Sequence, residues 1–206
     1  QRQMCIRDRS LDRYVFERVC IWLKSRRENG RQMTPVSVNL SRSHLLDDDF
    51  LSWFVGTADR YGVDHELIEF ELTESTFMDN DQIQRMRAYV MQMHELGFRM
   101  SIDDFGTGYS SISLLRELNA DVLKLDRRFF LEMDDHKARD VVNCLVELAK
   151  KLNIRAVAEG IETKKQIEYL KAIGCDIIQG YFFSRPLPQK EFDVWYDGFD
   201  FCQYQV

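Results

Sequence analysis

Short apolar runs rich in β-branched residues alternate along the chain with longer segments in which apolar residues recur every three or four positions. The short runs predict strands, and the longer segments predict amphipathic helices. The predicted strands are Pro35–Ser41, Leu67–Leu72, Phe98–Asp103, Val122–Asp126, Ile154–Glu159 and Asp176–Gly180. The predicted helices fall near Leu11–Glu28, Asp48–Tyr61, Asp81–Leu96, Ser110–Leu118, Ala138–Leu152, Lys164–Ile173 and Gln189–Phe199.

Residues that typically begin or end helices support this division. Gly97 and Gly174 directly follow helical segments, where a left-handed residue commonly ends a helix and glycine adopts it at least cost. Thr163 precedes another helical segment and is a suitable N-cap.

The alternation of strands and helices predicts the α/β class, with a parallel sheet and helices outside it. Eight strands would close a (β/α)8 barrel, and six leave an open sheet as the rival. Because no stretch is rich in Pro, Gly or Ser, we expect one domain over residues 11–206. Residues 1–10 are charged and aperiodic, and we expect them to be an unstructured or spurious tail.

A polar side chain that can bind a metal ion or form a hydrogen bond lies at the carboxyl end of every predicted strand. In barrels of this class, the carboxyl ends converge on the rim that carries the active site. In chain order these residues are Asn39, Glu71 with Glu74, Asp103 with Asp104, Lys124 with Asp126, Glu159 with Glu162, and Gln179.

Several carboxylates in one place repel one another unless a cation lies among them. Oxygen ligands without His or Cys favour Mg²⁺ or Mn²⁺ over zinc. The adjacent Asp103 and Asp104 could flank two ions, as in two-metal phosphoryl chemistry. Lys124 could hold a water molecule or a phosphoryl oxygen.

A structural reading competes at each position taken alone. A single Asp or Glu after a strand is most often a helix cap or a solvated loop residue, and a buried Lys124 can be an ion-pair partner. The same feature on six strands favours the functional reading.

Other segments add weaker signals. Gly106 and Gly108, after Asp104, permit tight turns and suggest a mobile loop over residues 104–111 that carries or locks the metal ligands. The four histidines are expected to be surface or packing residues. The run Tyr181-Phe182-Phe183 is expected in the core, with one ring as an alternative stacking partner for a base.

Composition limits the classes of partner. The chain of 206 residues is 45% hydrophobic and 30% charged, with a formal net charge of −6 and no basic block. It therefore lacks the basic face that binds long nucleic acid. No apolar run is long enough to span a membrane, and the five cysteines are scattered. We expect reduced thiols and a cytoplasmic domain, with upstream membrane segments in a longer protein left open.

Six segments, VNLS, ELTES, DDFGTGYSS, VLKLD, AEGIET and QGYFFSRPLP, together resemble the successive signatures of the EAL domain family. The resemblance runs from about Leu11 to Phe192. It implies a modified (β/α)8 barrel that hydrolyses cyclic-di-GMP to linear pGpG with Mg²⁺ or Mn²⁺.

The resemblance also implies roles for individual residues. Asn39, Glu71 and Asp103 match ligands of a first metal ion, and Asp103, Asp104 and Glu159 match the cluster around a second. Lys124 matches the lysine that contacts the reactive water, and Glu159 a residue read in the family as a general base. Glu74 matches a glutamate that steadies the loop after Asp103. Glu162 matches a supporting carboxylate, and Gln179 a substrate-side amide.

The E-A-L tripeptide that names the family, and whose glutamate is a metal ligand there, is absent from this chain. Six strands are found where the family has eight, so we expect a domain that is incomplete at its N-terminus. Two readings stay open: a phosphodiesterase domain, or an inactive domain that serves as a cyclic-di-GMP receptor or protein-interaction module. An enolase-like barrel is a remote third. A homodimer and an upstream sensory or GGDEF domain are compatible with the resemblance.

Overall fold

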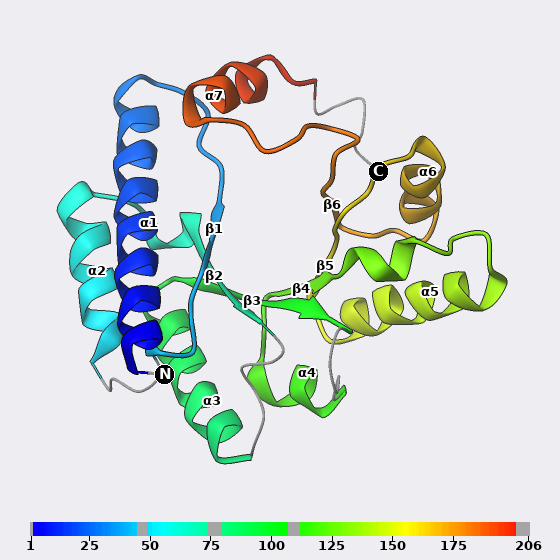
Figure 1. Cartoon of the computed structure of the whole chain (residues 1–206), viewed down its shortest axis with the longest axis horizontal. Helices are drawn as coiled ribbons and strands as arrows, with labels where there is room; N and C mark the ends of the chain where they lie inside the picture. Colours follow the sequence, from blue (N-terminus) through cyan, green and yellow to red (C-terminus); the bar gives the residue numbers. More distant parts are fainter. Residues whose placement is uncertain (1, 45–48, 74–79, 107–111, 201–206) are drawn as a thin grey trace. The chain divides into compact units, whose positions relative to one another are not determined.

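The computed structural model describes residues 2–44, 49–73, 80–106 and 112–200 (Figure 1). They belong to two compact units. The first comprises Gln1–Asp103 with Gly108–Asp121, and the second comprises Asp104–Thr107 with Val122–Val206. That the whole chain folds as one domain stays a prediction.

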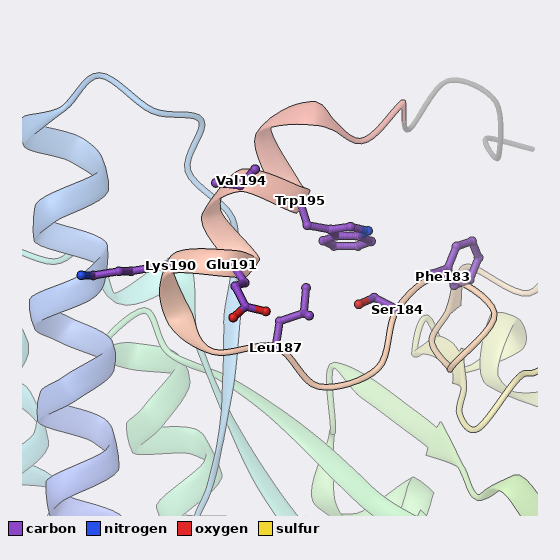
Figure 2. Close-up of a pocket in the computed structure, with 7 residues that line it drawn as sticks. All are labelled: Phe183, Ser184, Leu187, Lys190, Glu191, Val194 and Trp195. Carbon is purple, nitrogen blue, oxygen red and sulfur yellow. The ribbon is translucent and has the colours of Figure 1, made fainter.

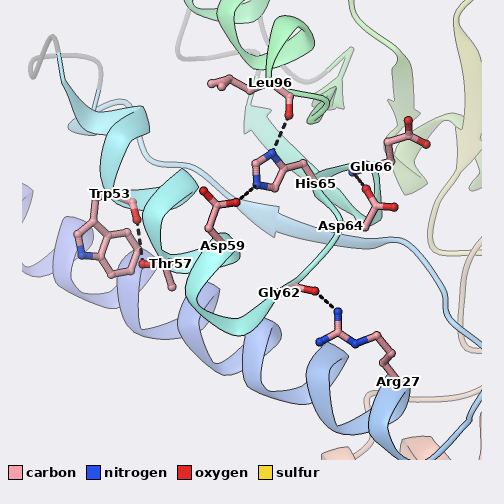
Figure 3. Close-up of polar contacts among 9 residues, drawn as sticks. All are labelled: Arg27, Trp53, Thr57, Asp59, Gly62, Asp64, His65, Glu66 and Leu96. Carbon is pink, nitrogen blue, oxygen red and sulfur yellow. Dashed lines mark hydrogen bonds and ion pairs between the residues drawn. The ribbon is translucent and has the colours of Figure 1, made fainter.

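The first unit alternates helices and parallel strands, and polar contacts join its elements, such as those of the His65 ring with the Leu96 carbonyl oxygen at 2.7 Å and with Asp59 Oδ1 at 3.1 Å (Figure 3). Strands β1, β2 and β3 are neighbours in that order, with Asn39 opposite Glu71 and Thr73 opposite Asp103. The elements are α1 (Arg2–Glu28), β1 (Val36–Asn39), α2 (Phe50–Tyr61), the 3-10 helix η2 (His65–Leu67), β2 (Ile68–Thr73), α3 (Asn80–Glu95), β3 (Arg99–Phe105) and α4 (Ile112–Leu118).

An aromatic cluster joins α1 and α2 to one face of the first unit's strands. The ring of Phe70 on β2 lies 5.8 Å from that of Phe16 and 5.2 Å from that of Phe54, and all three side chains are buried. Successive side chains on a strand point to opposite faces. Glu71, next to Phe70, therefore points away from these helices.

The second unit repeats the same pattern. Its strands are parallel and follow one another in sequence order. The elements are β4 (Val122–Leu125), η4 (Arg127–Phe130), α5 (His136–Lys151), β5 (Arg155–Ala158), α6 (Lys164–Ala172), β6 (Ile177–Ile178) and α7 (Gln189–Gly198). Val142, Val146 and Ala149 form the buried stripe of α5, at the spacing that places side chains on one face of a helix.

The last helix borders a shallow hollow of about 590 Å³ (Figure 2). Leu187, on the connection that leads to α7, and Trp195, on α7 itself, line it. No residue of α7 is buried, and Val194 is 76% exposed.

The predicted strands and helices are confirmed in number and order over the described ranges. Two expectations were wrong. Residues 2–10 are not an unstructured tail, because α1 begins at Arg2 and Arg9 donates from Nε to the Ser43 carbonyl oxygen at 2.8 Å. Tyr181 is not a core residue, because its side chain is 51% exposed. No helix in the described part of the chain has the length and apolarity needed to cross a bilayer.

The predicted helix ends are also confirmed. Gly97 and Gly174 have φ of 88° and 69°, in the left-handed region that glycine tolerates. Thr163 accepts a hydrogen bond from the Gln166 backbone N–H, and Gln166 Oε1 accepts one from the Thr163 N–H at 3.0 Å. This reciprocal pair is a capping box, and it fixes the start of α6.

Thr163→Ala removes the hydroxyl that caps α6. We expect the free energy of unfolding to fall by about 1 kcal/mol, measured by urea denaturation. Thr163→Ser keeps an acceptor and serves as the control, with stability close to that of the unchanged chain. Equal losses in both variants would contradict the capping account.

Three cysteines differ sharply in environment. Burial, with a smaller effect from Glu17, raises the pKa of Cys20 to about 12, and burial raises the pKa of Cys175 to about 11. Cys144 is exposed. Since the thiolate is the reactive form, the two buried thiols stay protonated and unreactive near neutral pH.

We therefore expect selective labelling by iodoacetamide at pH 8 in a Cys5→Ser, Cys202→Ser background. Cys144 should be modified in the folded chain, and Cys20 and Cys175 only after urea is added. Peptide mass spectrometry assigns the sites. Labelling of either buried thiol at the rate of Cys144 in the folded chain would overturn the assignment.

Candidate functional site at the strand ends

Three oxygen-bearing side chains occupy one face of the first unit's strands. Asn39 and Glu71 are register partners, and Glu71 is in turn the partner of Ser101. Register partners on neighbouring strands point to the same face. Asp103, two residues beyond Ser101, points that way too. Asn39, Glu71 and Asp103 thus share the face opposite the helix-packed aromatic cluster.

The chain that leaves β1 is held in two places. Leu40 donates its backbone N–H to the carbonyl oxygen of Glu71 at 2.9 Å, and Ser41 donates to Asp12 Oδ2 at 3.0 Å. The same carboxylate oxygen lies 3.1 Å from Nε2 of the buried His44. Asp12 on α1 therefore helps to fix the backbone just beyond Asn39.

Sequence reasoning missed Asp12, which lies 29 positions before Ser41. The only sequence signal was a carboxylate on a helix that packs beside β1, and this does not distinguish Asp12 from a solvated residue. The expectation that His44 is a packing residue is confirmed. Its ring is 1% exposed and lies edge-on to Phe54, with 5.3 Å between centroids.

The second unit carries an ion pair between a buried lysine and a half-buried glutamate at its strand ends. Lys124 Nζ on β4 lies 2.8 Å from Oε1 of Glu159, the residue that directly follows β5. Lys124 is 7% exposed. The backbone N–H of Glu159 donates to the carbonyl oxygen of Leu125 at 3.1 Å, which fixes the carboxylate beside the ammonium. The interpretation of Lys124 as an ion-pair partner is therefore compatible with its predicted function of holding a water molecule or a phosphoryl oxygen.

Gln179 follows β6 and is tied to the segment after β5. Its backbone N–H donates to Ala158 at 2.8 Å, and its carbonyl oxygen accepts from Ile161 at 3.1 Å. At the next residue, Gly180, an added Cβ would lie 2.1 Å from the Ile161 carbonyl oxygen. Glycine is required there for the two segments to approach, and this closeness places Gln179 beside the residues that flank Glu159.

Asp126 fits the structural reading of a strand-end carboxylate. It caps η4 and accepts from the backbone N–H of Arg128 at 3.0 Å and from Arg128 Nε at 2.7 Å. Burial acts to raise the pKa of Asp126, but the hydrogen bonds and charge of Arg128 outweigh it and hold that pKa below its ordinary value. Its function here is to start a helix.

The other predicted site residues, Asp104, Glu162 and Glu74, say less about the chemistry of the site. Asp104 has a left-handed backbone, with φ of 54°, which is uncommon for a residue other than glycine. Glu162 is exposed, and its backbone N–H donates to Gln166 Oε1 at the start of α6. Glu74 and residues 107–111, including Gly108, lie outside the described residues.

The donor chemistry of the first unit's face suits a hard cation. Asn39, Glu71 and Asp103 offer oxygen atoms only, as Mg²⁺ and Mn²⁺ prefer. Between them lies Ser101, whose buried hydroxyl has no hydrogen-bond partner within the described ranges. Within those ranges, no three His, Cys, Asp or Glu side chains are grouped so that they could hold an ion. Asn39, Glu71 and Asp103 therefore offer the type of ligand atom that these metals bind. The other two predicted ligands, Asp104 and Glu159, belong to the second unit.

Residues 5–186 match the EAL domain family. The chain belongs to that family. It is 36% identical over 179 residues to "Cyclic di-GMP phosphodiesterase NbdA" of Pseudomonas aeruginosa, a match that covers 86% of this chain and 23% of that protein. It is also 36% identical over 183 residues to "Probable cyclic di-GMP phosphodiesterase PdeB" of Escherichia coli, covering 89% of this chain and 33% of that protein.

Solved EAL domains have the same fold. The chain matches the EAL domain of Mycobacterium smegmatis DcpA with a TM-score of 0.83 at 30% identity, over 97% of this chain and 87% of that one. It matches "PaMucR Phosphodiesterase, c-di-GMP complex" with a TM-score of 0.80 at 32% identity, over 89% and 74%. These matches confirm the predicted fold class, the modified (β/α)8 barrel of the EAL family.

The Lys124–Glu159 pair is expected to contribute to the free energy of unfolding. In metal-free buffer, Glu159→Gln removes the carboxylate that lies 2.8 Å from a buried ammonium. We expect the free energy of unfolding to fall by about 3 kcal/mol, measured by urea denaturation. Adding Lys124→Met should recover most of this loss, because both charges are then gone.

Glu168→Gln is the matched control. Glu168 pairs with Lys164 at 3.6 Å on the surface, where both side chains are more than half exposed, so the loss should not exceed about 0.5 kcal/mol. Additive losses in the Lys124 and Glu159 double variant would show that the two charges do not stabilise each other.

Proposed function

We propose that this chain belongs to the phosphodiesterase domain of a cyclic-di-GMP signalling protein, and that this domain hydrolyses cyclic-di-GMP to linear pGpG. The observation that carries the proposal is the contact at 2.8 Å between the buried Lys124 and the half-buried Glu159, at the strand ends of a chain that belongs to the EAL family. An acid and a base held this way suit the orientation and deprotonation of a water molecule. The relatives named above, which bear the name cyclic di-GMP phosphodiesterase, support the substrate.

We further propose Mg²⁺ or Mn²⁺ as the cofactor. Asn39, Glu71 and Asp103 would hold one ion, and Asp103, Asp104 and Glu159 a second, on the chemistry of their oxygen donors. When bound, such ions lower the pKa of a coordinated water molecule and offset charge on the phosphoryl group.

This chain's own residues have distinct tasks in the proposed reaction. Glu159 accepts a proton from the attacking water, and Lys124 donates a hydrogen bond that orients that water or a phosphoryl oxygen. The water oxygen bonds to phosphorus, and the bond from phosphorus to the ribose 3′ oxygen breaks. The 3′ oxygen takes up a proton, and the phosphate stays on the 5′ side, as in pGpG. Gln179 is a substrate-side amide donor.

The chain spans 23% of the length of NbdA and 33% of PdeB, so it corresponds to one segment of such proteins. A cytoplasmic location is proposed with the function, supported by the free thiols of Cys20, Cys144 and Cys175. A homodimer and a sensory or GGDEF domain in a longer protein stay proposals.

The test is hydrolysis in ¹⁸O-water with Mg²⁺ or Mn²⁺, followed by mass spectrometry. We expect pGpG with one solvent oxygen on its phosphate, and no product after chelation. Asp103→Asn should lower kcat by about 100-fold or more, because it weakens a shared metal ligand. Lys124→Ala should lower kcat more than it raises KM.

Asp126→Asn is the control, because Asp126 directly follows the strand that carries Lys124 but caps η4. Its kcat should stay within about twofold of the unchanged chain. Tight binding of cyclic-di-GMP without turnover under either metal would overturn the phosphodiesterase proposal in favour of a receptor. Wild-type turnover by Asp103→Asn would remove the metal assignment.

A further inference from the structure

Tyr181 and Arg185 form an exposed aromatic–cation pair in the loop that follows β6. The Tyr181 side chain is 51% exposed, and the guanidinium carbon of Arg185 lies 4.6 Å from its ring centroid. Within the described residues, Arg185 has no carboxylate partner, in contrast to Arg128, which is bound to Asp126. The guanidinium therefore keeps its N–H donors available for another group.

Hydrogen bonds hold this loop in one conformation. Phe182 donates its N–H to the Ile161 carbonyl oxygen at 3.0 Å, and Phe183 donates to Gly180 at 3.1 Å. Ser184 Oγ donates to the carbonyl oxygen of Arg185 at 2.7 Å. These bonds restrain the backbone on both sides of the ring, so the pair is organised before any ligand arrives.

The pair lies close in the chain to the proposed catalytic residues of its unit. Tyr181 is two residues beyond Gln179, and the loop is bonded to Ile161, two residues beyond Glu159. The absence of a side chain at Gly180 lets the two segments touch, since an added Cβ would lie 2.1 Å from the Ile161 carbonyl oxygen. Tyr181 and Arg185 thus belong to the same edge of the second unit as Glu159 and Gln179.

The chemistry of the pair selects a particular ligand group. A phenol ring and a planar guanidinium both stack on nucleobases, and the larger π-face of a purine gains more from stacking. A guanidinium also donates to phosphate oxygens in a planar fork. A cyclic dinucleotide of guanine carries both groups, a purine and a phosphodiester, within one small molecule.

We propose that Tyr181 and Arg185 form a purine-stacking subsite that holds one guanine of cyclic-di-GMP. The subsite rests on the proposed function, and it adds a determinant of substrate affinity that takes no part in the chemical step. Loss of stacking should therefore weaken binding and leave turnover of the bound substrate unchanged.

The test compares Tyr181→Ala, Tyr181→Phe, Arg185→Ala and Arg185→Lys in the full chain. KM and kcat for cyclic-di-GMP are measured with Mg²⁺, and Kd by equilibrium binding in EDTA. Tyr181→Ala should raise KM and Kd about 10-fold, the lower part of the range for a stacked base, with kcat within about twofold. Tyr181→Phe should retain wild-type values, and Arg185→Lys should resemble Arg185→Ala, because an ammonium lacks the planar face.

Tyr14→Ala is the matched control, because Tyr14 is 62% exposed on α1 in the first unit. It should change neither constant. If the unchanged chain binds cyclic-di-GMP and Tyr181→Ala keeps KM and Kd within about twofold of the unchanged chain, the subsite is overturned but the proposed function is not. A fall in kcat at unchanged KM overturns it as well. An unchanged chain that neither binds nor hydrolyses cyclic-di-GMP overturns the proposed function and the subsite with it.

Discussion

The parallel register of the strands is the constraint on which the candidate site depends. Parallel strands bring their carboxyl ends to the same edge, and period-two alternation sends neighbouring side chains to opposite faces. On β2, this puts Phe70 against Phe16 and Phe54 while Glu71 takes the other face, level with Asn39. A slip of one residue would move Glu71 into the aromatic cluster. Apolar packing on one face therefore determines where the oxygen donors lie on the other.

Contacts just beyond the strands then refine the positions of these groups. The Asp12 carboxylate holds the Ser41 amide after β1, and the bonds among Ala158, Ile161 and Gln179 join the segments after β5 and β6. Such bonds satisfy backbone groups that no longer have a strand partner. They also hold the loops that carry polar side chains in one conformation. The candidate site residues thus lie at strand ends where hydrogen bonds hold the segments that follow the strands.

The strands, the helices and the strand-end residues could be predicted because their signals are local. The structure places all six within two residues of the carboxyl end of a strand: Asn39, Glu71, Asp103, Lys124, Glu159 and Gln179. Asp12 could not be found, since its contact spans 29 positions and its own neighbourhood resembles any exposed helix face. Tyr181 was assigned to the core because aromatic runs are usually buried, whereas the turn after Gly180 sends this ring outward. The helix over residues 2–10 lacks apolar periodicity, the primary feature by which a helix is recognised in sequence.

The pair of Lys124 and Glu159 has a consequence for how this unit folds. A carboxylate that loses part of its contact with water is stabilised by a positive neighbour, and here that neighbour is covalently part of the chain, 2.8 Å away. Unlike small zinc domains, whose ligands gather only around their ion, this unit has an internal counter-charge from the moment it folds. Folding of this unit therefore gives Glu159 a positive partner from within the chain itself. Under the proposed metal assignment, an ion that binds Glu159 would replace this lysine as the partner of the carboxylate.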